Sequence, residues 1–276
     1  MDIKSLFAPE LSPNELGFLS PEIGKTIEAC RSQHAIWFKL AEDINRSCQA
    51  MLGEFQIGPG EIVATRLFAL LFLIRTLSNF QGAILTAERG MDVEARTLAR
   101  CCFENLFCVA TLRNEGDKFI SEMDSGAKAA EKSKARWILQ EPARLEFSGP
   151  NAAQKLQAHV EAMDKKWGKL TTLEWKALSE RGGVGDSYLF YKLLSGDAAH
   201  PSFASLERYI KSGPGGVLKG VQLGPELAAI GDTLNYACNA VIMVGLAVAE
   251  VLGNDSRQKE ISDHARVYAQ LNGLKL

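Results

Sequence analysis

Three hydroxyl-bearing residues at helical spacing form the chemically richest pattern in the chain. Tyr188, Tyr191 and Ser195 follow one another at steps of three and four residues, so in a helix their hydroxyls share one face. Asp186 or Ser187 precedes them and is expected to cap the start of that helix. Such a polar edge within an apolar segment can hold a polar ligand, and we predict that Tyr188, Tyr191 and Ser195 are ligand-binding residues.

A histidine capable of acid–base chemistry follows directly. His200 stands before Pro201, whose fixed φ suits the first turn of a helix, and Ser202 comes next. The imidazole would then lie beside unpaired backbone N–H groups, a place that favours an anion and a neutral histidine. A neutral histidine there can act as a general base, which makes His200 a candidate catalytic residue and Ser202 a candidate ligand-binding residue. The alternative is a structural hinge in which His200 caps the helix or hydrogen-bonds Tyr191 or Ser195.

A row of charged residues lies earlier in the chain, on the predicted helix 92–114, which is otherwise mostly apolar. Arg96, Arg100 and Glu104 are spaced by four residues and therefore lie on one face. One interpretation is an exposed ladder of ion pairs, each worth about 0.2–0.5 kcal/mol. The other turns Arg100 and Glu104 inward as a charge pair that lines a cavity. In that case both are candidate catalytic residues and Arg96 is a ligand-binding residue.

Two sets of residues together resemble a known family. The pattern Gly-x-x-x-Glu-Ala-Arg-x-Leu-x-Arg-x-x-x-Glu at residues 90–104, followed by Tyr-x-x-Tyr-x-x-x-Ser and His-Pro-Ser, is similar to a family of bacterial all-helical domains of unknown function. The resemblance covers roughly residues 61 to 210. It implies that Arg100, Glu104, Tyr191, Ser195 and His200 belong to one site, and it implies no particular reaction.

A weaker resemblance concerns the last helix. Arg257 and His264 are separated by six residues, which places them on one helix face, and the polar Gln258 follows the arginine. This spacing is similar to the Arg-to-His signature of HEPN helical bundles, many of which are metal-independent ribonucleases of toxin and phage-defence systems. The resemblance implies Arg257 and His264 as an alternative catalytic pair. A solvated C-terminal helix explains the same spacing.

Long helices are the elements expected to position these groups. Apolar residues recur at three-and-four spacing, and no run of alternating β-branched residues is bounded by hairpin turns. The predicted helices cover residues 21–55, 61–89, 92–114, 117–140, 151–166, 172–180, the segment around 188, a segment after 201, 225–252, and a last helix capped by Asp255 or Ser256. We therefore predict an all-α fold, an irregular multi-helix bundle. Residues 1–20 would form an N-terminal arm and 21–276 a single helical domain, with a possible exposed break at 141–151.

Composition and motifs limit which partners and cofactors the protein is expected to bind and in which cellular compartment it is expected to lie. The formal net charge of −2 and pI near 6.1 give no basic field for duplex DNA. Six cysteines without a C-x-x-C pair are expected to be reduced, and the absence of nucleotide-loop and metalloprotease motifs predicts no cofactor and no metal site. The first residues lack a continuous hydrophobic run, which indicates a cytoplasmic protein. The apolar runs 67–74 and 234–252 are too short or interrupted by polar residues, so no membrane partner is expected.

Basic residues and a tryptophan occur together at residues 128–169, between the charged row at 96–104 and the segment around Tyr188. The cations are Lys128, Lys132, Lys134, Arg136, Lys165, Lys166 and Lys169, with Trp167 among them. Solvated helix faces explain such a pattern, and a strip that contacts RNA would have the same composition.

Two hypotheses of function remain open. The first, which we favour, is a binding or interaction module, either a monomer or a homodimer, whose buried polar groups fix helix register or hold a small polar or anionic ligand. The second is a metal-independent HEPN-like ribonuclease. In it His200 or His264 would take the proton from a 2′-hydroxyl, and Arg100 or Arg257 would stabilise the phosphate. Whether the chain is an enzyme stays open at this point.

Overall fold

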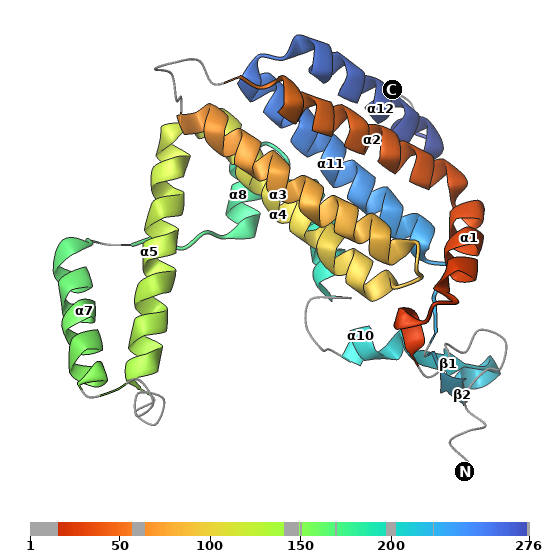
Figure 1. The fold of residues 1–276 in the computed structure, drawn as a ribbon, viewed down its shortest axis with the longest axis horizontal. Coiled ribbons are helices and arrows are strands. Elements are labelled where there is room, and N and C mark those ends of the chain that lie inside the picture. Colours follow the sequence, from red (N-terminus) through yellow and green to blue (C-terminus); the bar gives the residue numbers. More distant parts are fainter. Residues whose placement is uncertain are drawn as a thin grey trace.

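The prediction of an all-α protein is confirmed by a computed structural model of the chain (Figure 1). The structure describes residues 16–56, 64–140, 149, 151–168, 170–196, 203–222 and 224–274. Its α-helices are α1 (Ile23–Gln33), α2 (Ala35–Glu54), α3 (Ala64–Ala87), α4 (Asp92–Glu115), α5 (Asp117–Leu139), α7 (Ala152–Lys166), α8 (Trp175–Arg181), α9 (Ser187–Leu194), α10 (Phe203–Glu207), α11 (Ile230–Leu252) and α12 (Asp255–Leu271). Two short strands, β1 (Ile210–Ser212) and β2 (Leu218–Val221), pair antiparallel.

Three long helices form the centre of the bundle. Figure 1 shows α3, α4 and α11 packed side by side, with α2 and α12 covering α11. The short helices α8 and α9 pack against α4. By length and composition alone, α3 and α11 could each cross a membrane, with mean hydropathies of 1.5 and 1.6. The contacts of α11 with four other helices bury 61% of its most apolar window. A helix that is apolar on all sides is what the centre of a soluble bundle requires as well.

The single helix predicted for residues 21–55 is divided in the structure. α1 ends at Gln33 and α2 begins at Ala35, because His34 leaves the helical region with φ −117° and ψ 29°. The Nε2 atom of His34 lies 2.7 Å from the carbonyl oxygen of Leu227, and the ring packs against Gly231 at the start of α11. The break therefore comes from a tertiary contact with residues almost 200 positions away in the chain.

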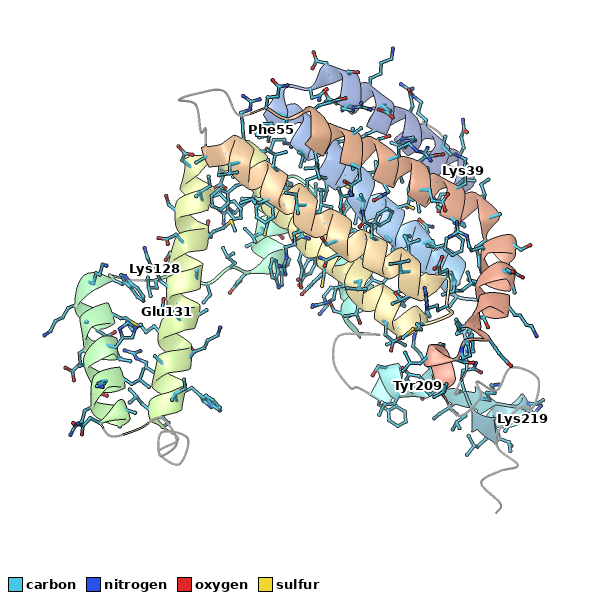
Figure 2. The ribbon with its side chains drawn as sticks, viewed as in Figure 1. Lys39, Phe55, Lys128, Glu131, Tyr209 and Lys219 are labelled. Carbon is cyan, nitrogen blue, oxygen red and sulfur yellow. The ribbon has the colours of Figure 1, made fainter. Side chains whose placement is uncertain are left out.

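The segment that follows residue 202 also differs from the prediction. α10 has only five residues, and residues 210–221 form the β1–β2 hairpin where no strand was predicted, seen around Tyr209 and Lys219 in Figure 2. Gly215 and Gly216 have φ of 74° and 76°, which allows the chain to reverse between the strands. The strands are three and four residues long and mostly exposed, so they leave no alternating apolar pattern in the sequence.

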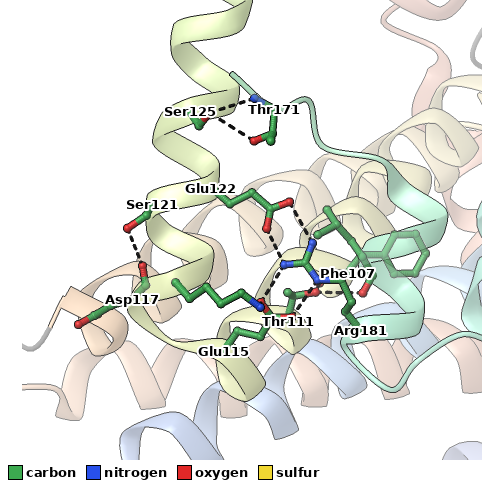
Figure 3. Close-up of polar contacts among 11 residues, drawn as sticks. Phe107, Thr111, Glu115, Asp117, Ser121, Glu122, Ser125, Thr171 and Arg181 are labelled. Atoms are coloured by element: carbon green, nitrogen blue, oxygen red, sulfur yellow. Dashed lines mark hydrogen bonds and ion pairs between the residues drawn. The ribbon is translucent and has the colours of Figure 1, made fainter. Parts of the chain in front are cut away.

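Helices α5 and α7 form an arm that extends from the bundle (Figure 1). Arg181 of α8 fixes the root of this arm by hydrogen bonds of 2.8 and 2.9 Å to Glu115 and of 2.9 and 2.5 Å to Glu122 (Figure 3). Between those glutamates, Gly116 turns the chain with φ 54°. The arm is therefore joined to α4 and α8 through one shared guanidinium. Most of the predicted break at 141–151, and residues 1–15 of the predicted N-terminal arm, lie outside the described residues.

The predicted cap of the last helix is wrong by one or two positions. Asn254 stands at the N-cap of α12, and its side-chain oxygen accepts a hydrogen bond of 3.1 Å from the backbone N–H of Arg257. Asp255 occupies the first turn instead, where its charge suits the positive end of the helix.

Candidate functional site

The charged row of α4 lies at the junction with α9 and α11. Arg96 is 5% exposed, and the side chains of Arg100 and Glu104 are 21% and 19% exposed. Arg100 Nη1 lies 3.0 Å from Glu104 Oε1. The row is thus a partly buried charge seam and not a solvent-exposed ladder. We call Arg96, Arg100, Glu104 and Tyr191 the α4 seam.

Both arginines of the α4 seam approach an aromatic ring from a neighbouring helix. The guanidinium carbon of Arg96 is 5.4 Å from the ring centroid of Tyr236 in α11, and that of Arg100 is 5.6 Å from the ring of Tyr191 in α9. Arg100 Nη1 also donates a long hydrogen bond of 3.4 Å to the Tyr191 hydroxyl. Because cations over aromatic rings are attracted by the ring quadrupole, Arg96 links α4 to α11 and Arg100 links α4 to α9.

Burial shifts the protonation equilibria around Glu104. It raises the pKa of Glu104 above the usual range, while the positive charges of Arg100 and Arg75 act in the opposite direction. Burial also raises the pKa of the Cys101 thiol, and that of Cys108 to about 12, with Glu104 adding to both effects. These thiols are therefore neutral near pH 7 and are weak nucleophiles. Glu104 is a carboxyl group that takes up a proton more readily than an exposed glutamate does.

The hydroxyl groups of α9 are positioned by the aromatic packing below them. Tyr191 is 8% exposed, and its ring stacks on that of Tyr188 with 5.6 Å between centroids. Phe107 of α4 supports both tyrosine rings, at 6.3 and 5.7 Å. Ser195 donates a 2.7 Å hydrogen bond to the backbone oxygen of Tyr191, so its hydroxyl proton is directed to its own helix. Asp186 stands at the N-cap as expected, but its side chain forms no capping hydrogen bond.

The predicted site is only partly described. The structure brings Arg100, Glu104 and Tyr191 into contact, as one site would require. His200 and Ser202 lie in the segment 197–202, outside the described residues, so their predicted roles stay predictions.

The alternative pair on α12 is engaged with α2. Arg257 Nε lies 3.0 Å from both carboxylate oxygens of Glu54, and Nη1 of the same guanidinium binds Glu260. Ser47 Oγ donates a 2.7 Å hydrogen bond to Glu260 and lies 2.8 Å from His264 Nε2. The hydrogen bond from Arg257 holds the pKa of Glu54 at about 2. Arg257 and His264 thus share one helix face and one network, and the network joins α12 to α2.

Another polar cluster is absent from the sequence-based predictions. Asp92, 4% exposed, accepts hydrogen bonds of 2.5 Å from Thr233 and from Arg208, and it borders a small cavity of about 100 Å³ beside the hairpin. The acid in the first turn of α4 is visible in the sequence, but its partners lie 116 and 141 residues away and give no local signal. Across the described ranges, no group of three or more His, Cys, Asp or Glu side chains is arranged to hold a metal ion.

Comparison with known proteins places the α4 seam within a recognised domain. Residues 66–217 match a family of unknown function, DUF5677, and this match spans more than half of the 276 residues. No curated protein and no solved structure matches the chain. The matched range contains the α4 seam and the whole of α9, whereas Arg257 and His264 lie beyond its end. The chain therefore belongs to the DUF5677 family of unknown function.

Proposed function

We propose that this protein is a helical binding module whose α4 seam receives the anionic group of a small polar ligand. The observation that carries the proposal is the position of Arg100. The side chain of this arginine lies between α4 and α9, and among the described residues its one carboxylate partner is Glu104, at 3.0 Å. Its buried Nε forms no hydrogen bond within the described part of the chain. A buried guanidinium with an unused donor favours an additional acceptor.

The charge balance supports an anion in particular. Arginine stays protonated at all ordinary pH values, whereas burial shifts Glu104 toward its neutral form. Protonation of Glu104 would leave Arg100 without its counter-charge. A carboxylate or phosphate oxygen that entered beside Tyr191 would restore this balance and could bind the guanidinium through two parallel hydrogen bonds. Tyr191 accepts from Arg100 and can donate its own proton to the same ligand oxygen.

Binding is better supported than catalysis by the groups that the structure describes. Ser195 donates to a backbone oxygen, and the Cys101 thiol beside Glu104 has a raised pKa. Neither is an activated nucleophile of the kind that an adjacent base creates. For the ribonuclease alternative, the Arg257 guanidinium is bound to Glu54 and Glu260, and a phosphate would have to displace these carboxylates.

The test uses the full chain and inorganic phosphate as the probe. Phosphate should raise the melting temperature of the parent protein in a concentration-dependent way. This rise should disappear in Arg100→Gln and decrease in Tyr191→Phe. The matched control is Arg113→Gln, which removes another α4 arginine paired with one carboxylate, Glu250, at 3.2 Å.

The same measurement also gives the result that would contradict the proposal. If phosphate stabilises Arg100→Gln as much as the parent and Arg113→Gln, the α4 seam does not bind the anion. Incubation of the parent with a single-stranded RNA in the presence of a chelator separates the alternative. Cleavage that is lost in Arg257→Gln or in His264→Ala would favour the ribonuclease and count against a purely binding role.

A further inference from the structure

A cleft lies on the arm, away from the α4 seam. It has a volume of about 570 Å³ and is open between the second half of α5 and the chain that follows α7. Its polar lining comes mainly from one face of α5, with Lys132, Ser133, Arg136, Trp137 and Gln140. Figure 2 shows Lys128 and Glu131 earlier on the same helix, on the part of the arm that α7 accompanies. The arm thus carries a polar cleft of its own.

The cleft holds more positive than negative charge. Lys132 and Arg136 share one carboxylate, that of Asp164 in α7, so two cations meet one anion. Arg136 uses only Nη2 for this contact, at 3.0 and 3.1 Å from the two Asp164 oxygens. Nε and Nη1 of the same guanidinium are left to donate to another acceptor, since the described part of the chain offers them none. The side chain of Arg136 is 54% exposed, so an incoming anion can reach it.

The shared carboxylate also orders the two cations. Hydrogen bonds from Lys132 and then from Arg136 hold the pKa of Asp164 below its usual range, so Asp164 is ionised at neutral pH. Asp164 therefore holds both cations at the α5–α7 contact, and the lysine is only 18% exposed in its side chain. A phosphate that binds there loses less side-chain entropy than it would on free lysines.

An aromatic surface stands next to the cations. Trp137 follows Arg136 in the sequence, lines the same cleft and is 49% exposed. Planar heterocycles stack on exposed indole rings, and each such base contact contributes about 1–3 kcal/mol in proteins that bind single strands. Ser133 and Gln140 add hydrogen-bonding groups at the cleft wall that can meet the edge of a base.

We propose that this cleft of the α5–α7 arm binds a nucleotide, with the phosphate at Arg136 and Lys132 and the base against Trp137. The shared chemistry is a phosphate joined to a planar heteroaromatic ring. It can come from a free mononucleotide or from one nucleotide of a single-stranded RNA. The site is separate from the α4 seam, because its lining residues belong to the arm and the segment after α7.

The experiment compares probes that differ in one part of this chemistry. Adenosine 5′-monophosphate should bind the full-length protein at least about fivefold more tightly than ribose 5-phosphate, the factor expected from the weakest base–aromatic stacking. Trp137→Leu should remove this difference while it leaves the ion pairs with Asp164 in place. Arg136→Gln should weaken both probes. Lys134→Gln is the matched control, because it removes an exposed cation from the same helix that does not line the cleft.

The source of the nucleotide is decided with a fluorescein-labelled single-stranded RNA of about 12 nucleotides. Tighter binding of the RNA than of the mononucleotide, with affinity that falls as salt increases, would assign the cleft to a strand. Equal or weaker binding of the RNA would assign it to a free nucleotide. Titrations repeated in Arg100→Gln separate this cleft from the α4 seam, because the cleft should keep its affinity there.

Three results would overturn the proposal. They are the absence of binding of both adenosine 5′-monophosphate and RNA, equal affinity for ribose 5-phosphate and adenosine 5′-monophosphate, and equal effects of Arg136→Gln and Lys134→Gln. Circular dichroism of each variant shows whether the arm keeps its helices. Trp137→Leu decides the base contact even if Arg136→Gln loosens the arm.

Discussion

Removal of the Arg181 guanidinium should loosen the arm from the bundle in a pH-dependent way. Arg181 binds both Glu115 and Glu122 across the α4–α5 turn (Figure 3), and the two carboxylate side chains are 16% and 23% exposed. Substitution Arg181→Met keeps the length of the side chain and removes its charge. The two carboxylates would then face each other without a shared cation. We therefore expect a destabilisation larger than that of an ordinary surface ion pair.

The magnitude follows from the pKa of Glu115. Hydrogen bonds from Arg181, which has the larger effect, and from Lys118 lower this pKa from 4.5 to about 2. Each pH unit between the folded and unfolded values corresponds to about 1.4 kcal/mol, so the whole shift would give roughly 3 kcal/mol at neutral pH. The part due to Lys118 remains in Arg181→Met. Screening by water at this partly exposed pair reduces the expected loss to about 1–2 kcal/mol.

The sign of the pH dependence is fixed by the direction of the shift. A carboxyl group with a lowered folded pKa stabilises the protein above its unfolded pKa, and this contribution disappears as the pH falls toward the folded value. The difference between the parent and Arg181→Met should therefore be complete at pH 7. It should start to shrink below about pH 5 and nearly vanish close to pH 2, since Glu115 titrates between 4.5 and about 2.

Two measurements test this prediction. Urea unfolding at pH 7 and pH 3 gives the free energies, and hydrogen exchange reports on the amides of α5 and α7 separately from the central helices. Lys176→Met is a matched control, because its ion pair with Glu180 on the same helix is long, at 3.9 Å, and mostly exposed. A loss below about 0.5 kcal/mol at pH 7, or a loss that is equal at both pH values, would refute the reasoning.

Two other substitutions test particular contacts of the bundle. Gly90→Ala should destabilise the protein by more than about 1 kcal/mol in thermal or urea unfolding, because φ is +74° and the new Cβ would lie 2.5 Å from the Cβ of Pro225. Gly53→Ala, where nothing lies within 4 Å of an added Cβ, should be neutral or slightly stabilising, and equal effects of the two would contradict the account. Arg257→Met should cost about 1–3 kcal/mol, because it breaks the link of α12 to two carboxylates. Arg266→Met, which removes a 62% exposed arginine of the same helix, should change stability by less than about 0.5 kcal/mol, and a similar loss in both would show that the network is not needed.

Local patterns predicted the helices but not their partners. The four-residue spacing of Arg96, Arg100 and Glu104 places them on one face of α4 whatever surrounds that helix. The spacing of residues does not indicate whether such a face is exposed to water or packed against another helix. The burial of this row followed only from the approach of Tyr191 in α9 and Tyr236 in α11, two helices that pack against α4.

The errors of the sequence-based prediction have the same origin. His34 stands within a good helical pattern, and the break there follows from its contact with Leu227. The β1–β2 hairpin is short and exposed, so no apolar alternation marked it in advance. The sequence-based prediction contained the basic residues of this region with Trp167, but neither Trp137 nor a cleft, because a concave surface needs two chain segments at a known distance.

The amino-acid sequence by itself determined the helical character of this protein, the main helix boundaries and the faces on which charged residues lie. These properties depend on interactions between residues a few positions apart, which the order of residues specifies directly. Only the tertiary structure decided which faces are buried, which arginine meets which carboxylate, and where the arm leaves the bundle. Those features depend on contacts such as that of Arg181 with Glu115, between residues 66 positions apart, and packing alone brings such residues together.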